Sequence, residues 1–553
     1  MPGVTVLAMP LRLVNTRSVA SACFALCLCA CGEAPRERPD IILISLDSVR
    51  SDALDFRDAN AAPVLTALAE RGSVFGNATS GSSWTLPAHV QMLSGSPPSL
   101  HGVISDDLKI DPNTALLAEE LQRAGYFTAG VFTAGYLWGD YGFDRGFDIY
   151  QSASTEADLH LEDGSRLPRG SEATARKFEA EANQGITSPL VARAVGRVLD
   201  QLETQPPEQP AFLFLHLFDP HYDYIPPEPW DTHYDPDYSG DLDGREFWTN
   251  KRIWDETQLP PRRISERDLQ HLIALYRGEV AWTDSQLGLI FEKLERAGRL
   301  DNALVIVTAD HGEEFFDHGA RGHRHTLYDE LTRVPLLIVP PEGGSTVADV
   351  ATQVSLSDLM PTALDYAGVA PPASSDGRTL RPAIEGQAFA DRPALSTLYF
   401  PSKSASGAQR HRFLHTLRTP AEKLSRTLVL NANDRLRLKE VAWFDLTTDP
   451  LEQNPVHNRS DPRLAAAWDR LEAEFARLRE QHSKLPRVPE AARASDMRDA
   501  LFDQLEALGY IEGDAEETVA PALQLPWGLA PFPAFELTRK TSRRRAHRVQ
   551  GEN

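Results

Sequence analysis

Runs of consecutive apolar residues recur through the first part of the chain, at residues 40–47, 127–134, 211–219, 302–312 and 333–341. Polar residues do not alternate with the apolar ones, a pattern typical of strands that are buried on both faces of a parallel sheet. Helical spacing separates these runs, most clearly at residues 62–72, 172–204 and 266–298. This alternation predicts an α/β fold, with a doubly wound, mostly parallel sheet flanked by helices.

The pattern changes after about residue 375. Short apolar runs at residues 395–400, 412–419, 425–431 and 435–446 predict antiparallel strands. A helix is predicted at 463–482, because one stripe of its surface is apolar, made by Trp468, Leu471, Phe475 and Leu478. We therefore expect a catalytic α/β domain at 39–375 and a smaller α+β subdomain at 376–512. Residues 513–553 have no apolar periodicity and are predicted to be disordered.

The amino terminus has the features of an export signal. Arg12 and Arg17 precede an apolar run that is too short to span a bilayer. The segment "LCAC" resembles the lipid-attachment box of bacterial lipoproteins, with Cys31 as the lipidated residue and 32–38 as a tether. We expect residues 1–31 to direct an exported lipoprotein to the membrane, periplasmic or associated with the outer membrane. Ordinary signal cleavage nearby is the alternative.

Charge and cysteine content exclude several classes of function. The formal net charge of −23 argues against nucleic-acid binding, which normally needs a basic surface. All four cysteines of the 553-residue chain lie at or before Cys31, so the folded body has no disulfide framework and no thiolate metal site.

Acidic residues and a histidine follow the apolar runs where parallel strands would end. Asp47 closes the first run, and Asp310 and His311 close the run at 302–312. Open α/β sheets place their ligand sites at this edge. Carboxylate oxygens with one imidazole suit Mg²⁺, Mn²⁺, Ca²⁺ or Zn²⁺, so we expect a divalent metal ion there.

Thr85, in the stretch "SSWTLPAHV", is the candidate nucleophile. A threonine hydroxyl is a poor nucleophile unless a metal or a base activates it, and a bound dication would lower its pKa. A helix is expected to begin near Pro87, and its N-terminus would favour an anionic substrate.

Four histidines in two loops predict an anion pocket, where they could bind ester oxygens or protonate a leaving group: His216, His221, His323 and His325. His89 and His101 could each line the site or brace its loop. Arg50 and Asp52 are expected to form a buried structural pair.

The assembled motifs resemble the sulfatase family of the alkaline phosphatase superfamily. They include "PDIILISLDSVRSDAL", "SSWTLPAHVQMLSGSPPSLHGV", "VIVTADHGEEFFDHG", "GHRHTLYDELTRVPLLI" and, near the C-terminus, "WFDLTTDPLEQNP" and "LFDQLEALGY". By this resemblance the metal ligands are Asp47, Thr85, Asp310 and His311, with one metal ion as the simpler expectation. A second ion would use Asp219, His221 and His323.

The chain departs from the sulfatase pattern at three positions. Thr85 replaces the Cys or Ser that sulfatases mature to formylglycine, His89 replaces an Arg, and Ser48 replaces the second Asp of the metal pair. Relatives with a Thr nucleophile act on phosphorus esters. The resemblance therefore implies a hydrolase or transferase of phosphate esters, including diesters, or of sulfate esters, through a covalent threonine ester.

Thr85, His221 and His323 are the expected catalytic residues, and His89, His216 and His325 are expected to bind substrate. The expected substrate is an anionic ester, either a small molecule or linked to a lipid or glycan. Two alternatives remain open: sulfate-ester hydrolysis without formylglycine, and an inactive membrane-tethered binding protein.

Overall fold

The computed structural model describes residues 38–153, 187–255, 262–341, 346–403, 409–430, 436–483 and 492–493. The predicted signal segment with Cys31, the first part of the helix predicted at 172–204 and the tail at 513–553 lie outside these residues. Among the described residues, none of the helices is both long enough and apolar enough to cross a bilayer.

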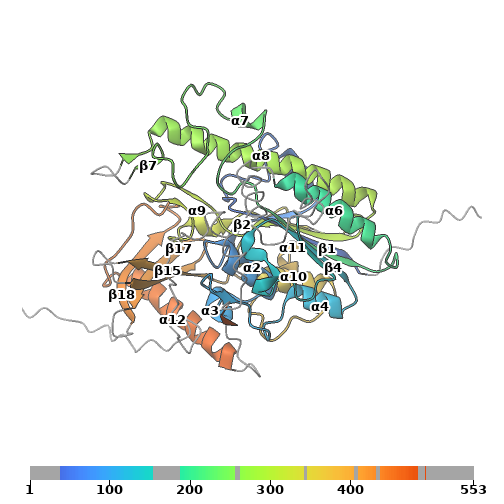
Figure 1. Cartoon of the computed structure of the whole chain (residues 1–553). Coiled ribbons are helices and arrows are strands. Elements are labelled where there is room, and N and C mark those ends of the chain that lie inside the picture. Colours follow the sequence, from blue (N-terminus) through green and yellow to red (C-terminus); the bar gives the residue numbers. More distant parts are fainter. Residues whose placement is uncertain are drawn as a thin grey trace, which may run out of the picture. The chain divides into compact units, whose positions relative to one another are not determined.

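The central sheet is built on five parallel strands in the order β5-β4-β6-β1-β9 (Figure 1). Their bounds are Ile149–Ser152, Phe127–Phe132, Ala211–Leu217, Asp40–Leu46 and Ala303–Ala309. Every residue of β1, β4, β6 and β9 is buried. This burial confirms the prediction that these continuous apolar runs form strands covered on both faces.

Four further strands make the sheet mixed. β13 (Leu336–Val339) runs antiparallel to β9 and to β2 (Ser73–Thr79), β12 (Arg333–Val334) runs antiparallel to β2, and β14 (Asp349–Ser355) is parallel to β2. The run predicted as one strand at 333–341 is thus divided at Pro335. Only β12 and β13 oppose the common strand direction, so the mostly parallel sheet is confirmed.

Helices cover both faces of this sheet (Figure 1). On one side lie α6 (Ser188–Leu202) and the long α8 (Glu266–Arg296), and on the other lie α2 (Thr85–Ser94), α4 (Leu117–Arg123) and α10 (Leu359–Tyr366). The short α1 (Pro63–Ala69) packs on α8. Asp284 of α8 accepts hydrogen bonds from the backbone N–H groups of Val64 and Leu65, at 3.0 and 2.9 Å, and so caps α1 from another helix.

Short elements occupy the connections. They are α3 (Pro98–His101), β3 (Leu108–Lys109), α7 (Trp230–His233), β7 (Trp254–Asp255), β8 (Arg262–Arg263), β10 (Glu314–Phe315), β11 (Arg321–Gly322), α9 (Asp329–Thr332), α11 (Arg381–Ile384) and β19 (Ala492–Arg493), with 3-10 turns at Gly135–Leu137, Gly139–Tyr141 and Leu356–Asp358.

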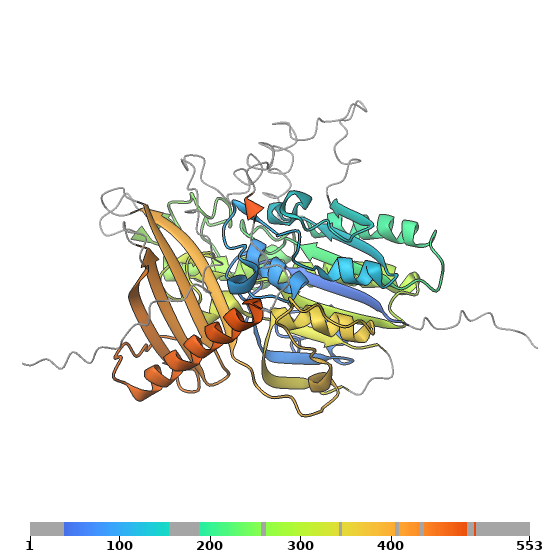
Figure 2. The ribbon, with the colours of Figure 1, turned by 90° about the horizontal axis from the view of Figure 1, so that it is seen from below.

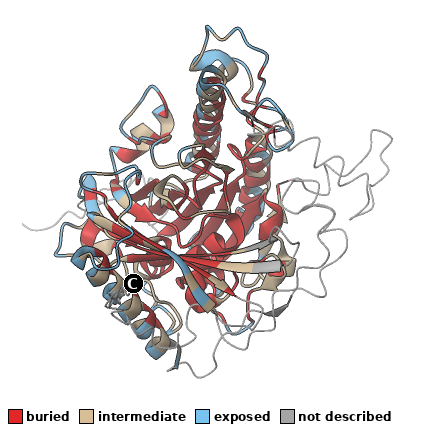
Figure 3. Ribbon diagram, turned by 90° about the vertical axis from the view of Figure 1, so that its left-hand side faces the viewer, coloured by how far each residue is buried: buried red, intermediate tan, exposed pale blue. Residues whose placement is uncertain are grey.

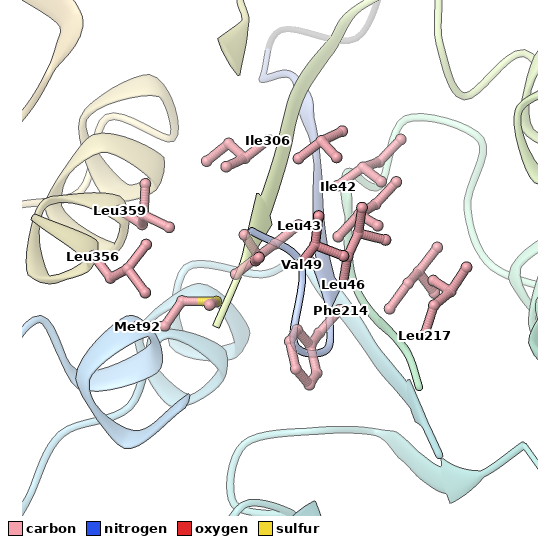
Figure 4. Close-up of a cluster of buried hydrophobic side chains, with 14 of the residues drawn as sticks. Ile42, Leu43, Leu46, Val49, Met92, Phe214, Leu217, Ile306, Leu356 and Leu359 are labelled. Atoms are coloured by element: carbon pink, nitrogen blue, oxygen red, sulfur yellow. The ribbon is translucent and has the colours of Figure 1, made fainter. Parts of the chain in front are cut away.

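The core lies between the sheet and its helices, where the interior of the ribbon is buried (Figure 3). Ile42, Leu43 and Leu46 of β1 contribute to it, with Ile306 of the neighbouring β9 (Figure 4). Met92 of α2 lies in the same cluster, so the helix that begins at Thr85 is anchored in the core. Burial of this apolar surface is the main favourable contribution to folding.

The C-terminal part forms a separate antiparallel sheet, in the order β15-β16-β17-β18. The strands are Ala394–Lys403, Gln409–Arg418, Glu422–Leu430 and Leu436–Asp445. Helix α12 (Pro462–Ser483) lies across this sheet (Figure 2) and buries Leu471, Phe475 and Leu478 against it. These antiparallel strands and the amphipathic helix agree with the sequence pattern.

Candidate active site

The functional side chains lie where two neighbouring strands of the central sheet end. Asp47 follows β1, and Asp310 and His311 follow β9, which is paired with β1 in register up to Leu46 and Ala309. Both strand ends therefore reach the same edge of the sheet. The three side chains are fully buried.

Thr85 is the first residue of helix α2. The backbone of Trp84 before it is extended, and Gly95 ends the helix in the left-handed conformation, with φ 67°. The side chain of Gln91, one helical turn and a half further on, accepts a hydrogen bond from the N–H of Gly81 at 2.6 Å. The turn that carries Thr85 is thus tied back to its own helix.

These elements bring one hydroxyl, two carboxylates and one imidazole together. Nε2 of His311 lies 3.4 Å from Oγ1 of Thr85, 3.5 Å from Oδ1 of Asp47 and 3.4 Å from Oδ2 of Asp310. Nδ1 of His311 donates to the carbonyl oxygen of Gly312 at 2.8 Å, so in the neutral ring Nε2 carries the lone pair. All four groups point into one small volume.

The donor set fits a divalent cation. Ligand atoms of Asp47, Asp310 and His311 lie within 4.8 Å of one another. Oδ2 of each aspartate accepts no hydrogen bond from the described residues, although both atoms are buried. Two adjacent buried carboxylates without full hydrogen bonding are costly unless a cation balances them. Oxygen donors with one imidazole suit a hard or borderline dication.

The pKa values of the two aspartates are shifted in opposite directions. Burial alone would raise the pKa of Asp47, but the neighbouring imidazoles of His216, His221 and His311 hold it below its usual range. Burial and the neighbouring charge of Asp47 raise the pKa of Asp310 well above its usual range. The repulsion between the pair is what a bound cation would relieve.

His89 uses both ring nitrogens within the protein. Nε2 lies 2.9 Å from the hydroxyl of Ser45, and Nδ1 donates to the carbonyl oxygen of Thr85 at 2.8 Å. Burial lowers the pKa of His89 to about 3. The structure thus gives His89 a bracing role beneath the nucleophile, which is one of the two roles left open by the sequence.

His216 and His325 also have protein partners. Nε2 of His216 lies 3.3 Å from Oδ2 of Asp47, and Nδ1 lies 3.2 Å from the hydroxyl of Thr133. His325 pairs with Glu314 at 2.7 Å and donates from Nδ1 to the carbonyl oxygen of His323. The geometry therefore favours support of the site over direct contact with substrate for both residues.

His323 and His221 lie beside the cluster. The ring of His323 is 4.5 Å from that of His311 and 5.1 Å from that of His221, measured between centroids. Nδ1 of His323 is 3.1 Å from Oε1 of Glu313. Oε2 of the same carboxylate accepts a hydrogen bond from the hydroxyl of Tyr224. Glu313 thus fixes the ring of His323, with Nε2 as the nitrogen that can face a substrate. Burial lowers the pKa of His221 to about 4.

Asp219 is engaged elsewhere. Its carboxylate accepts hydrogen bonds from the N–H groups of Thr187 and Ser188 at 3.2 and 2.9 Å, and from both hydroxyls. Asp47, Asp310 and His311 form the only metal-ligand cluster in the described part of the chain. The second ligand set expected from the sequence is therefore not assembled in the structure.

Arg324 braces the nucleophile loop from outside. Its backbone is left-handed, with φ 68°, and its N–H donates to the carbonyl oxygen of Ser83 at 3.0 Å. The guanidinium lies 4.0 Å from the ring centroid of Trp84 and pairs with Asp106 at 2.9 Å. The hydrogen bond to Ser83 and the cation–π contact with Trp84 hold the two residues that directly precede Thr85.

Ser48 and Arg50 hold the loop after β1. Ser48 stands at the position where the sulfatase pattern has a second aspartate. Its hydroxyl donates to Oδ1 of Asp47 at 2.9 Å and so orients the carboxylate of Asp47. Arg50 pairs with Asp52 at 2.8 Å and with Asp317 at 2.9 Å. The side chain of Asp52 is 64% exposed, so the expectation of a buried pair is wrong.

His101 is buried, and its Nδ1 accepts a hydrogen bond from the N–H of Val103, so it braces its own loop.

The C-terminal sheet contacts the same nucleophile loop. The hydroxyl of Ser396 in β15 donates to the carbonyl oxygen of Ser80 at 2.6 Å, and the N–H of Thr397 donates to that of Gly81 at 2.7 Å. The smaller subdomain therefore contributes to the position of Thr85.

Sequence reasoning missed Ser45, Glu313 and Glu314 as supports of the site. The two glutamates directly follow the Asp-His motif, so their position after the strand was an available signal. The role of Ser45 depends on how α2, which carries His89, packs against β1, and a single sequence does not contain this packing.

Comparisons with known proteins agree with this arrangement. Residues 39–369 match the family described as Sulfatase, and residues 315–481 match the family described as N-sulphoglucosamine sulphohydrolase, C-terminal. The chain is 24% identical over 515 residues to an N-acetylglucosamine-6-O-sulfatase of Bacteroides thetaiotaomicron, covering 79% of this chain and 86% of that protein. It is also 24% identical to an arylsulfatase of Clostridium perfringens, covering 77% of this chain and 91% of that protein.

The fold resembles a crystal structure of the phosphonate monoester hydrolase of Agrobacterium radiobacter. The TM-score is 0.57 at 23% identity, covering 80% of this chain and 96% of that one. A family match over most of the described catalytic part, together with the cluster at the ends of β1 and β9, settles the affiliation. This chain belongs to the sulfatase family of ester hydrolases.

Proposed function

We propose that this protein cleaves a phosphate or sulfate ester, with Thr85 as the nucleophile and a divalent metal ion held by Asp47, Asp310, His311 and Thr85. The main support for this proposal is the distance of 3.4 Å between Oγ1 of Thr85 and Nε2 of His311, beside the buried carboxylates of Asp47 and Asp310. A cation at this place would act as a Lewis acid that favours the ionised form of the threonine hydroxyl.

Thr85 forms the new bond in this proposal. Its hydroxyl passes its proton to Nε2 of His323 and the oxygen attacks the phosphorus or sulfur atom. The bond to the leaving oxygen breaks, that oxygen keeps the bonding electrons, and it receives the proton from His323 to depart as the alcohol. The product is a covalent threonine ester, which water or an acceptor alcohol then cleaves to restore the free hydroxyl. His89 and Ser45 hold the backbone of Thr85, so the nucleophile is positioned before substrate binds.

His323 is assigned to proton transfer, and His221 to the water or alcohol that cleaves the threonine ester. Glu313 orients His323 through Nδ1, so Nε2 carries the lone pair that takes the proton of Thr85 and passes it to the departing alcohol. The ring of His221 lies beside that of His323, and its Nδ1 donates to the carbonyl oxygen of Tyr222. Nε2 of His221 is therefore suited to accept a hydrogen bond from the attacking water or alcohol.

Sulfate and phosphate esters remain the two candidate substrates. The names of the sulfatase relatives support sulfate esters, including those of amino sugars, and the resemblance to a phosphonate monoester hydrolase supports a phosphorus centre. An unmodified threonine in place of the formylglycine precursor favours phosphorus.

A substrate panel tests this function. Purified protein is assayed with 4-nitrophenyl sulfate, 4-nitrophenyl phosphate, bis(4-nitrophenyl) phosphate and 4-nitrophenyl phenylphosphonate, with each of Mg²⁺, Mn²⁺, Ca²⁺ and Zn²⁺. Turnover of at least one ester that disappears in Thr85→Ala is the expected result. Absence of turnover and of bound metal in the wild type would instead support an inactive binding protein.

We further propose that the mature protein is an exported lipoprotein anchored through Cys31. Support comes from the "LCAC" box after the apolar signal segment. Fractionation of cells that express the wild type and Cys31→Ala tests this, and the wild type is expected in the membrane fraction and the variant in the soluble one. Equal membrane association of both proteins would contradict the anchor.

A further inference from the structure

A series of stacked rings runs from the candidate site to the surface. The ring of His323 stacks on that of Tyr222, with centroids 5.4 Å apart. Tyr222 in turn stacks on Phe247 at 5.6 Å and meets Trp248 edge-on at 5.4 Å. Trp248 is 40% exposed and is the only exposed tryptophan among the described residues.

Trp248 is exposed although its backbone is firmly held. Asp223 accepts hydrogen bonds from the N–H groups of Glu246 and Phe247 at 2.7 and 2.8 Å, which fixes the turn before Trp248. The guanidinium of Arg321 donates to the carbonyl oxygen of Trp248 at 2.6 Å. These bonds hold the backbone of Trp248, and its ring is held edge-on by Tyr222 at 5.4 Å and by Phe247 at 5.3 Å.

Gly322 shows how closely this ring approaches the catalytic loop. Gly322 directly precedes His323, and a Cβ atom at this position would lie 2.5 Å from the ring of Trp248. Its φ of 74° is also one that glycine favours. The ring of Trp248 therefore lies directly against the backbone that carries His323.

The charge beside the ring restricts the ligand. The guanidinium of Arg321 lies 5.3 Å from the ring centroid of Trp248 and 5.6 Å from that of Phe247. A cationic head group, such as a quaternary ammonium, would be repelled here, whereas a neutral or anionic ring would not. A partly exposed indole ring next to a cation is suited to a sugar ring, whose C–H groups pack on the indole while its anionic substituents lie near the guanidinium.

We propose that Trp248 is a stacking platform for a pyranose ring in the alcohol portion of the substrate, so that the enzyme acts on esters of charged glycans. This inference rests on the proposed function, because it names the group that the ester bond carries.

The test compares two pairs of esters and three variants. N-acetylglucosamine 6-sulfate and N-acetylglucosamine 6-phosphate supply a sugar ring without a cation, and the matching 4-nitrophenyl esters lack the sugar. For Trp248→Ala we expect KM for the sugar ester to rise about tenfold, the change worth ~1.4 kcal/mol, while kcat stays within about twofold. KM for the 4-nitrophenyl ester should rise less. Trp248→Phe, which keeps an aromatic face, should restore most of the affinity.

Leu289→Ala is the matched control, since Leu289 is an exposed apolar residue of α8. It should leave both KM values unchanged. An unchanged KM for the sugar ester in Trp248→Ala would overturn the platform. An equal rise for both esters would overturn the preference for a sugar, because it would mean that any flat ring stacks there.

A binding measurement separates this inference from the proposed function. If the wild type cleaves none of these esters, the proposed catalytic function fails. Calorimetric titration of N-acetylglucosamine 6-sulfate and of N-acetylglucosamine 6-phosphate into wild type and Trp248→Ala then tests the platform alone. Weaker binding to the variant supports the platform, and equal or absent binding overturns it.

Discussion

Oγ1 of Thr85 lies 3.4 Å from Nε2 of His311, although 226 residues separate them in the chain. The first begins helix α2, and the second follows strand β9. This contact joins the proposed nucleophile to the proposed metal ligands, and the proposed mechanism depends on it.

Replacement of Thr85 by Ala should abolish turnover. The variant lacks the only oxygen that forms the covalent ester, so we expect kcat to fall by at least ~10³-fold. The fold should persist, because alanine favours the helix that begins here. Thr85→Ser keeps a hydroxyl and should retain more activity than Thr85→Ala. Initial rates with the best ester of the panel, and circular dichroism of each variant, check this. Equal rates for Thr85→Ala and the wild type would disprove the role.

Metal content should depend on the aspartates of the cluster. We expect one divalent ion per chain by mass spectrometry of the purified protein, and its loss in Asp310→Asn, because one of two carboxylate ligands becomes neutral. Removal of the ion with EDTA should abolish activity and lower the melting temperature, since an ion bound only by the folded state stabilises it.

Asp219→Asn is the matched control for the metal measurement. Its carboxylate caps the start of α6 rather than joining the cluster. The content of one ion per chain should therefore persist in this variant. Two ions in the wild type, with one lost in Asp219→Asn, would instead indicate the second ligand set.

The brace between the two sheets should matter for catalysis. Ser396→Ala removes the hydroxyl that donates to the carbonyl oxygen of Ser80 and leaves a buried acceptor without this donor. We expect a loss of about 1–3 kcal/mol in stability and a decrease in kcat of roughly tenfold, because the loop before Thr85 is less well fixed. Ser425→Ala in β17 of the same sheet is the control. Similar kcat values for both variants would show that the brace has no effect on catalysis.

The cap on α1 predicts a pH dependence of stability. Burial raises the pKa of Asp284 to about 6, although the N–H donors of Val64 and Leu65 act against it. A carboxyl whose pKa is higher in the folded protein contributes most stability below its unfolded pKa, and loses it as the pH rises through the folded value. From pH 4 to pH 7 this group should reduce the free energy of unfolding by roughly 2 kcal/mol.

Asp284→Asn does not titrate and should lack this part of the pH dependence. Urea unfolding of both proteins between pH 4 and pH 7, followed by tryptophan fluorescence, measures the difference. The stability of the variant relative to the wild type should increase as the pH rises. Parallel curves would mean that Asp284 has an ordinary pKa.

Sequence pattern predicted the centre of the sheet better than its edge. β1, β6 and β9 are continuous apolar runs because helices cover both of their faces. β2 and β14 were not predicted, because each mixes buried and exposed residues. The break at Pro335 depends on pairing with two other strands, which local pattern does not contain.

The same limit applies to the site. Asp47, Asp310 and His311 follow apolar runs directly, so their convergence could be inferred from strand ends. The roles of His89 and His325 could not, because both depend on which partner occupies each ring nitrogen. The family resemblance suggested Asp219 as a ligand of a second metal ion, but the N-terminus of α6 offers its carboxylate four donors.

The bond from Ser396 to Ser80 spans 316 residues of chain. Synthesis proceeds from the amino terminus at about 5–20 residues per second, so this bond cannot form until roughly 15–60 s after Ser80 has been made. A fragment that stops before Ala394 carries the proposed nucleophile and every proposed metal ligand. It lacks Ser396, whose hydroxyl holds the loop before Thr85. The loop before Thr85 therefore acquires this hydrogen bond only after 396 of the 553 residues have been translated, so a shorter nascent chain lacks the complete geometry of the proposed site.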